Sequence, residues 1–146
     1  MITALIVDDE RLAREGVRVA LKRETDVEIV GEVADGPAAV EAIGTLAPDV
    51  VFLDIGMPGL NGFEVLQKVS QTQTRLPVII FVTACDQYAI KAFEAHALDY
   101  LLKPVEPGRF RDAMQRTREE LARAALLEQS RGRVIELLQS YERPAP

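Results

Sequence analysis

The chain has 146 residues, of which 48% are hydrophobic and 27% charged, a composition typical of a single globular domain. The formal net charge is −6, and an acidic domain is poorly suited to direct binding of nucleic acid, whose phosphates attract lysine and arginine. No apolar run approaches the roughly 20 residues that span a bilayer, and the first residues lack the pattern of a signal peptide. We therefore expect a cytoplasmic protein without membrane contact, and the single cysteine, Cys85, excludes an intrachain disulfide.

Five apolar segments rich in β-branched residues alternate with helical patterns along the chain. The apolar segments predict strands at residues 3–8, 28–34, 50–54, 78–83 and 97–102. The helical patterns cover about residues 11–23, 36–46, 62–70 and 87–94, and a last one starts near residue 106. Parallel strands need long crossover connections, so this alternation predicts an α/β fold, a doubly wound (βα)5 parallel sheet with helices on both faces. The second strand alternates apolar and polar residues, as an edge strand does.

The last helical pattern is unusually long, because it runs from Pro107 to about Glu142 whereas an average helix has about 11–12 residues. Pro107 suits a first turn, and Pro144 blocks continuation beyond the end. A three- and four-residue spacing, typical of a coiled coil but interrupted by Arg131, links Ala124, Leu127, Arg131, Val134, Leu138 and Tyr141. The pattern leaves two interpretations open. Either the helix packs on the sheet through residues 110–114 and then frays, or it is a connecting or dimerising helix, which we favour.

Acidic side chains end two of the predicted strands. Asp8 and Asp9 end the first strand and Asp54 the third, and open α/β sheets bind their ligands at these carboxyl ends. If the first and third strands are neighbours, the carboxylates converge and repel one another unless a cation neutralises them, and oxygen ligands suit Mg²⁺. The simpler alternatives are that Asp9 caps the following helix and that Asp54 is a solvated turn residue.

A hydroxyl and an ammonium group complete this edge of the sheet, because Thr83 ends the fourth strand and Lys103 follows the fifth. Together with the carboxylates they make a workable phosphoryl-transfer site. Asp54 would attack phosphorus, Mg²⁺ would screen the repulsion between anions, and Thr83 and Lys103 would bind the phosphoryl oxygens. Gly56 could present its backbone carbonyl to the metal without interference from a side chain.

The sequence resembles the receiver domain of two-component response regulators. The resemblance rests on "VDDE" at residues 7–10, "LDIGMPGLNG" at 53–62, "VTA" at 82–84 and "DYLLKP" at 99–104, in this order, and it covers about residues 1–120. It implies a flavodoxin-like sheet with strand order 2-1-3-4-5, dependence on Mg²⁺, and phosphorylation by a partner histidine kinase. A receiver of this kind is not an enzyme in the usual sense, since it catalyses only its own phosphorylation and dephosphorylation.

The resemblance also implies which residues bind the phosphoryl group and the metal. Asp54 would be the phosphoacceptor. Asp9 and Asp54 would ligate Mg²⁺ directly, Asp8 would assist through water, and the backbone carbonyl of Gly56 would complete the protein ligands.

The same resemblance assigns a switch to the fourth and fifth strands. Thr83 and Lys103 would bind the phosphoryl group, and Tyr100 would change its orientation together with Thr83. The peptide bond between Lys103 and Pro104 is expected to be cis.

Residues 81–110 resemble the subgroup whose output is a LytTR-type DNA-binding domain that regulates transcription. No such effector domain lies within the 146 residues. We therefore expect a receiver domain at residues 1–120 and a helical linker or dimerisation extension at 121–146. Homodimerisation is expected through the fourth helix, the fifth strand, the fifth helix and the C-terminal extension.

Two other functions compete with this interpretation. A Mg²⁺-dependent aspartyl phosphatase would carry a second Asp two residues after the nucleophile, but that position is Gly56. A flavodoxin-like cofactor binder needs a phosphate-cradling loop after the first strand, where residues 8–10 would repel phosphate. His96 is interpreted as a residue of a helix-to-strand junction, and Cys85 as an ordinary thiol that lies near the site.

Overall fold

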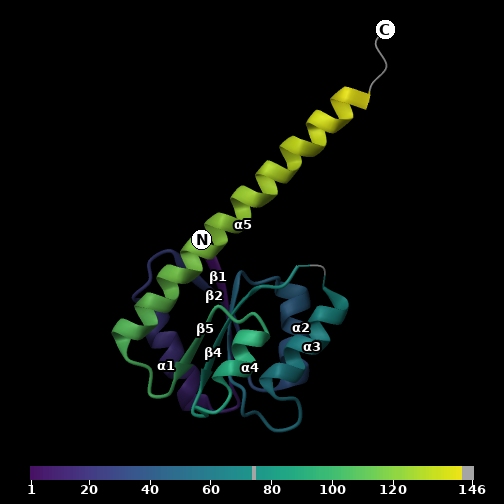
Figure 1. Cartoon of the computed structure of the whole chain (residues 1–146). Coiled ribbons are helices and arrows are strands. Elements are labelled where there is room, and N and C mark those ends of the chain that lie inside the picture. The colour runs from purple at the N-terminus through teal and green to yellow at the C-terminus, as the bar shows by residue number, and fades with distance from the viewer. Residues whose placement is uncertain (74, 143–146) are drawn as a thin grey trace.

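The computed structural model describes residues 1–73 and 75–142, and within them strands and helices alternate as predicted (Figure 1). The strands are β1 (Ile2–Val7), β2 (Val27–Val33), β3 (Val50–Leu53), β4 (Val78–Thr83) and β5 (Asp99–Leu102). The helices are α1 (Arg11–Lys22), α2 (Gly36–Leu46), α3 (Gly62–Thr72), α4 (Ala89–Glu94) and α5 (Pro107–Glu142). β5 begins later than predicted, because Asp99 is the first residue paired in register with β4.

The strands form one parallel sheet in the order β2-β1-β3-β4-β5, which confirms the flavodoxin-like topology. Val7 of β1 pairs with Leu53 of β3, which in turn pairs with Phe81 of β4. The carboxyl ends of these three neighbouring strands therefore reach the same edge of the sheet. β2 is an edge strand, as its alternating pattern predicted.

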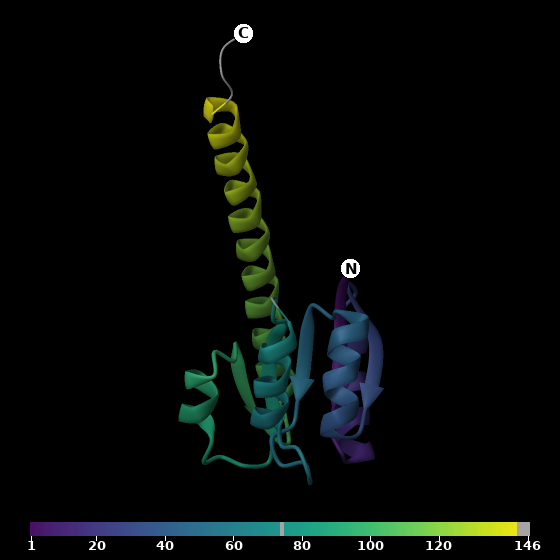
Figure 2. The ribbon, with the colours of Figure 1, turned by 90° about the vertical axis from the view of Figure 1, so that its right-hand side faces the viewer.

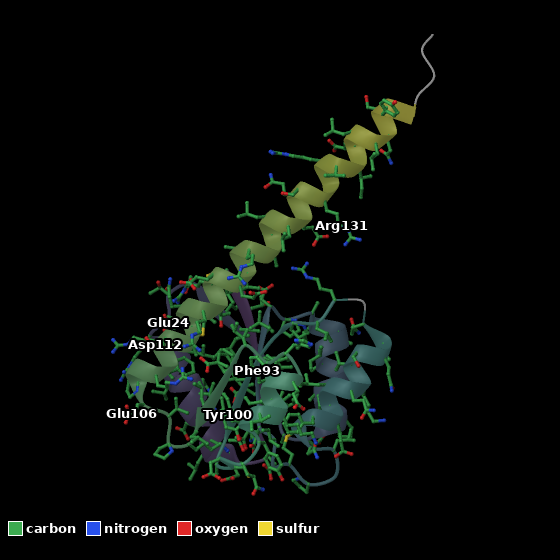
Figure 3. The ribbon with its side chains drawn as sticks, viewed as in Figure 1. Glu24, Phe93, Tyr100, Glu106, Asp112 and Arg131 are labelled. Carbon is green, nitrogen blue, oxygen red and sulfur yellow. The ribbon has the colours of Figure 1, made fainter. Side chains whose placement is uncertain are left out.

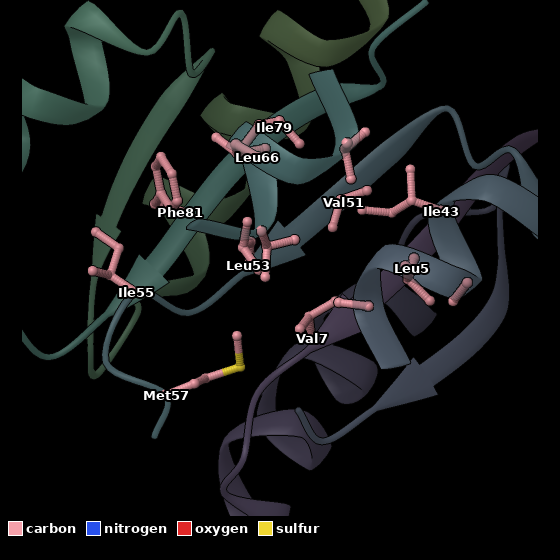
Figure 4. Packing of buried hydrophobic residues seen from close by; sticks show 14 of the residues in the cluster. Leu5, Val7, Ile43, Val51, Leu53, Ile55, Met57, Leu66, Ile79 and Phe81 are labelled. Carbon is pink, nitrogen blue, oxygen red and sulfur yellow. The ribbon is translucent and has the colours of Figure 1, made fainter. Parts of the chain in front are cut away.

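Each face of the sheet is covered by its own set of helices. Leu5 and Val7 point into the core shared with α2, α3 and α4, whereas Ala4 and Ile6 point into the core shared with α1 and α5. This alternation follows from the two-residue period of a strand. Figure 1 shows α1 and α5 on one side of the sheet and α2 and α3 on the other, Figure 2 views the side of α2 and α3, and Figure 4 shows the first core from nearby.

Local capping sets where the helices that flank the site begin. The Asp35 carboxylate accepts a hydrogen bond from the Ala38 N–H (2.8 Å) at the start of α2. Asn61 and Glu64 form a reciprocal capping box at the start of α3. Caps of this kind satisfy backbone N–H groups that have no partner inside the helix, and each contributes about 1 kcal/mol.

α5 is one continuous helix of 36 residues, and its two parts differ in environment. Near its start, Phe110 is buried and stacks on Phe52 of β3, with ring centroids 5.4 Å apart. Farther along, Arg118 ties the helix to the start of β2 through Asp26 (2.8 Å). Beyond this contact the helix projects from the domain (Figures 1 and 3).

The continuous helix agrees with the predicted length, and it does not fray after residues 110–114 as the first interpretation supposed. Pro144, which was expected to stop it, lies outside the described residues. Within the part of the chain that the structure describes, none of the helices has the length and apolar character needed to cross a membrane.

Candidate functional site

The predicted site residues lie at the carboxyl ends of four strands. Asp8 directly follows β1, Asp54 follows β3, Thr83 ends β4 and Lys103 follows β5. Backbone hydrogen bonds between neighbouring strands hold these residues at the same edge of the sheet. The Asp54 N–H donates to the Val7 carbonyl (3.0 Å), and the Lys103 N–H donates to the Thr83 carbonyl (2.9 Å). β1 and β3 are neighbours in the sheet, which is the condition under which the sequence predicted that the carboxylates converge.

Lys103 joins two of the carboxylates. Its ammonium lies 2.8 Å from Asp8 Oδ2 and 3.6 Å from Asp54 Oδ2, and both aspartates are buried. Burial by itself would lower the pKa of the Lys103 ammonium, but the hydrogen bond to Asp8 and the charge of Asp54 outweigh it and hold the pKa above its usual value. Lys103 is therefore a cation that is fixed between two buried anions.

Three consecutive carboxylates form an oxygen-rich cluster after β1. Asp8, Asp9 and Glu10 can each place one carboxylate oxygen within 4.8 Å of the other two. A set made only of carboxylate oxygens, partly open to solvent, fits the ligand preference of Mg²⁺. Glu10 was not among the predicted metal ligands, and it adds a third carboxylate directly after the aspartate pair.

The cap of α1 corrects one sequence-based alternative. The N-cap residue is Glu10, and its side chain makes no capping hydrogen bond, so Asp9 does not cap the helix. Asp8 instead turns the chain: its Oδ1 accepts a hydrogen bond from the Glu10 N–H (2.9 Å). Its backbone carbonyl accepts a hydrogen bond from the Arg14 guanidinium (2.7 Å). The capping interpretation of Asp9 is wrong because the helix begins one residue later than that role requires.

The connection between β3 and α3 returns the chain close to Asp54. The Gly56 N–H donates to Asp54 Oδ1 (3.3 Å), and the Gly62 N–H donates to the Ile55 carbonyl (3.1 Å). A Cβ at Gly62 would lie only 2.7 Å from the Asp54 carbonyl oxygen, so this position has no room for a side chain. The turn in between is completed by Gly59, whose φ of +78° is rarely adopted by other residues.

Thr83 and Tyr100 both contact the backbone of Cys85. Thr83 Oγ1 accepts a hydrogen bond from the Cys85 N–H (3.3 Å), and the Tyr100 hydroxyl donates to the Cys85 carbonyl. Burial raises the pKa of the Tyr100 hydroxyl, which keeps it a hydrogen-bond donor. Thr83 and Tyr100, which are expected to switch together, thus both form hydrogen bonds with the backbone of Cys85. Cys85 lies next to the site, as expected.

Two further expectations are confirmed near β5. The Lys103–Pro104 peptide bond is cis. His96 lies between α4 and β5 with a positive φ of 62°, so it is a junction residue. It lines an open groove at the amino-terminal edge of the sheet, together with parts of α3 and α5, and this groove contains none of the predicted site residues.

The face formed by α4, β5 and α5 carries exposed apolar side chains, and ion pairs join β5 to α5. Ile90 and Phe93 of α4 are 77% and 81% exposed, and Phe93 is labelled in Figure 3. On the side of β5 that faces α5, the buried Asp99 carboxylate is paired with Arg109 and with Arg116 (3.1 Å), both from α5. The first turns of α5 are therefore held to β5 beside Tyr100.

This fold and this arrangement of acids and lysine define a class of protein. The family described as "Response regulator receiver domain" matches residues 4–115, and the chain belongs to this family. Receiver domains typically bind Mg²⁺ at an acidic pocket, serve two-component systems whose partner is a histidine kinase, and are not classical enzymes.

The chain is similar to curated proteins that are named as transcriptional regulators. Over 120 residues it is 51% identical to "Transcriptional regulatory protein BtsR" of Salmonella typhi and 49% identical to BtsR of Escherichia coli strain K12. Each match covers 82% of this chain and 49% of the relative, so the chain spans about half the length of these curated relatives.

Solved structures show the same fold. The response regulatory domain of protein mrkE from Klebsiella pneumoniae is 33% identical with a TM-score of 0.76, and the match covers 84% of this chain and 99% of that one. The REC domain of AraT, a response regulator from Geobacillus stearothermophilus, is 32% identical with the same TM-score, over 85% of this chain and 98% of its own.

Proposed function

We propose that this chain is a phosphoacceptor receiver that takes a phosphoryl group from a histidine kinase onto Asp54. The observation that carries the proposal is the position of the Lys103 ammonium between the carboxylates of Asp8 and Asp54. A buried carboxylate next to a fixed cation, with a hydroxyl at the neighbouring strand end, can bind a phosphoryl group as an anion and accept it as a nucleophile.

In the proposed step, a carboxylate oxygen of Asp54 attacks the phosphorus of a phosphohistidine. The oxygen–phosphorus bond forms as the phosphorus–nitrogen bond breaks, and the released imidazole takes a proton from solvent. The product is an acyl phosphate on Asp54. Lys103 and Thr83 would contact its phosphoryl oxygens, and Lys103 would then exchange part of its attraction to Asp8 for the new negative charge.

Asp9, Asp54, the Gly56 carbonyl and, through water, Asp8 would hold the metal. When bound, Mg²⁺ supplies positive charge that reduces the repulsion between the carboxylates and the incoming phosphoryl group. The donor atoms are all oxygens, and Asp9 is exposed, so the metal could enter from solvent. Glu10 adds a further negative charge beside this set.

We further propose that phosphorylation is read out as homodimerisation through the face of α4, β5 and α5 and through the extension of α5. A phosphoryl oxygen on Asp54 that accepts a hydrogen bond from the Thr83 hydroxyl would draw Thr83 toward the site and away from the Cys85 N–H, and Tyr100 donates to the carbonyl of the same residue. Rearrangement there would change the surface around α4, where the exposed apolar side chains lie. Two-state elements of this kind respond to one charge-assisted contact.

The extension favours a parallel partner helix of the same sequence, and we place its start at residue 121 and the receiver at residues 1–120. All described residues from Ala125 to Tyr141 are exposed, including Leu127 (65%) and Leu138 (58%) of the coiled-coil spacing. If these residues form the seam, Arg123 and Glu128 flank it at positions that face each other across two parallel chains, and their charges are opposite.

A LytTR-type DNA-binding domain is the output that we propose for the full-length protein, because residues 81–110 resemble that subgroup and the relatives are named transcriptional regulatory proteins. The 146-residue chain itself would not bind DNA, given its net charge of −6. A mobility-shift assay should therefore detect DNA binding by the full-length gene product only. A mobility shift of DNA caused by this chain alone would contradict the proposal that only the output domain binds DNA.

The test of the central proposal is the intact mass after incubation with acetyl phosphate and Mg²⁺. One phosphoryl group should be added to the wild-type chain and none to Asp54→Asn, while EDTA should suppress the reaction. Undiminished labelling of the Asp54→Asn variant would exclude Asp54 as the acceptor.

A further inference from the structure

Gly36, the first residue of α2, lies against Leu60 of the connection between β3 and α3. A Cβ built on Gly36 would be 2.3 Å from Leu60 Cβ and 2.9 Å from the Leu60 carbonyl oxygen. The φ of Gly36 is outside the left-handed region, so its backbone conformation does not by itself require glycine. Glycine is required by the close approach of another segment, not by its own conformation.

The segment that approaches Gly36 carries Gly56. Residues 55–61 leave the carboxyl end of β3, and their side chains at Ile55 and Met57 are buried in the core on either side of Gly56 (Figure 4). Leu60 packs against the same core from a half-buried position. A Cβ built on Gly56 would meet no atom within 4 Å, so beyond the hydrogen bond of its N–H to Asp54 Oδ1 the loop is held by the residues around it.

We propose that Gly36 is a positioning residue for the metal site: α2 begins with glycine so that residues 55–61 can rest on its first turn and present the Gly56 carbonyl beside Asp54. This inference rests on the proposed function, in which that carbonyl is a metal ligand. Neither Gly36 nor Leu60 would touch the metal, so both would act through the path of the loop.

The loop, and not the helix, would move if a side chain were added at Gly36. α2 is fixed to the sheet by Ala39 and Ile43, which are 0% and 3% exposed, and its first turn is closed by the cap from Asp35. The loop in contrast is exposed at Pro58 and Gly59 and can shift toward solvent. A methyl group at position 36 would therefore displace the segment that carries the Gly56 carbonyl.

The test compares Mg²⁺ binding by calorimetry in the wild type and in Gly36→Ala, and amide hydrogen exchange of residues 55–61 in EDTA. We expect Mg²⁺ affinity to fall about tenfold, as for the loss of other groups that orient metal ligands without touching the metal. The loop amides should exchange faster without metal. Gly44→Ala is the matched control in the same helix, because a Cβ there meets only the flexible end of Gln73, and it should bind Mg²⁺ as the wild type does.

A second background separates this contact from a general effect on folding. In Leu60→Gly, where the opposing Cβ is gone, adding Gly36→Ala should weaken Mg²⁺ binding by a smaller factor than in the wild type. The proposal would be overturned if Gly36→Ala reduced Mg²⁺ affinity by the same factor in the wild type and in Leu60→Gly. It would also be overturned if Gly36→Ala folded and kept the wild-type Mg²⁺ affinity and the wild-type exchange of the loop amides.

If Gly36→Ala does not fold, Leu60→Gly alone decides. Leu60→Gly should weaken Mg²⁺ binding and speed hydrogen exchange in the loop, and wild-type behaviour would overturn the proposal. If the wild type neither binds Mg²⁺ nor accepts a phosphoryl group, the proposed function fails, and the exchange data still decide whether the loop rests on Gly36.

Discussion

Lys103 Nζ lies 2.8 Å from Asp8 Oδ2, and this contact crosses the sheet edge from the end of β5 to the end of β1. Because the same ammonium is 3.6 Å from Asp54 Oδ2, the domain carries its own counter-charge for the acidic site. The carboxylates therefore do not depend on a metal ion alone for neutralisation, so their charges also affect the stability of the metal-free protein.

Lys103→Met should destabilise the metal-free protein. The change leaves the buried carboxylates of Asp8 and Asp54 without their cation, at a cost of about 1–3 kcal/mol. Thermal melts in EDTA should show a lower Tm, and Mg²⁺ should raise the Tm of the variant more than that of the wild type. Lys68→Met, on the exposed side of α3, is the control and should melt like the wild type in both conditions. Equal Tm values for the two variants in EDTA would contradict the role of Lys103 as internal counter-ion.

Asp9→Asn should weaken Mg²⁺ binding without lowering the Tm in EDTA. Asp9 is exposed and does not cap α1, and within the described residues its side chain makes no hydrogen bond or ion pair that the change would break. The repulsion within the cluster of Asp8, Asp9 and Glu10 is reduced. Calorimetry with Mg²⁺ and melting in EDTA measure the two effects separately. A clear fall of the Tm without metal would reveal a structural role that the fold does not suggest.

Asp99→Asn should lower stability at pH 7 by about 1–3 kcal/mol, because Arg109 and Arg116 lose a buried charged acceptor. Burial alone would raise the pKa of the Asp99 carboxyl, but the hydrogen bonds from Arg109 and from the Tyr100 N–H outweigh it and hold the pKa below its ordinary value of 3.8. A lowered folded-state pKa means that this stability is present above pH 3.8 and is lost as the pH falls through the folded value.

Urea denaturation at pH 7 and near pH 3 therefore tests the role of Asp99. The difference in the free energy of unfolding between the wild type and Asp99→Asn should be smaller at the lower pH, because protonation of the wild-type carboxylate weakens its ion pairs there. If this difference in unfolding free energy were the same at both pH values, the ion pairs of Asp99 would contribute no more to stability than neutral hydrogen bonds.

Beryllofluoride with Mg²⁺ should convert the chain from monomer to dimer in sedimentation experiments at tens of micromolar. The exposed apolar residues of α4 and the extension of α5 provide the surface. Truncation after Leu121 should weaken the dimer if the extension contributes, and Leu127→Lys should weaken it further than Leu126→Lys, which lies off the predicted seam. A monomer under both conditions would rule out this output for the chain. A dimer that survives truncation unchanged would assign the contact to the α4, β5 and α5 face.

The strands, and the edge of the sheet at which the site lies, follow from features that the sequence determines by itself. Continuous apolar runs such as residues 50–53 and 78–82 form buried parallel strands because any other environment would leave them exposed to water. Polar residues that end such runs, Asp54 and Thr83 among them, must then gather at one edge of the sheet. The helical spacing up to Glu142 is likewise a local property, and α5 was predicted from it.

Only the tertiary structure decided which groups contact one another at that edge. Asp8 could have lain beside Asp9 and Glu10 alone, but the packing of β5 brings the Lys103 ammonium within 2.8 Å of the Asp8 carboxylate. The requirement for Gly36 was equally hidden, because it comes from Leu60, which is 24 positions away in the chain and reaches α2 only after β3 has crossed the sheet. Periodicity records which face of an element is buried, whereas contacts between side chains of different elements depend on distances that no local pattern encodes.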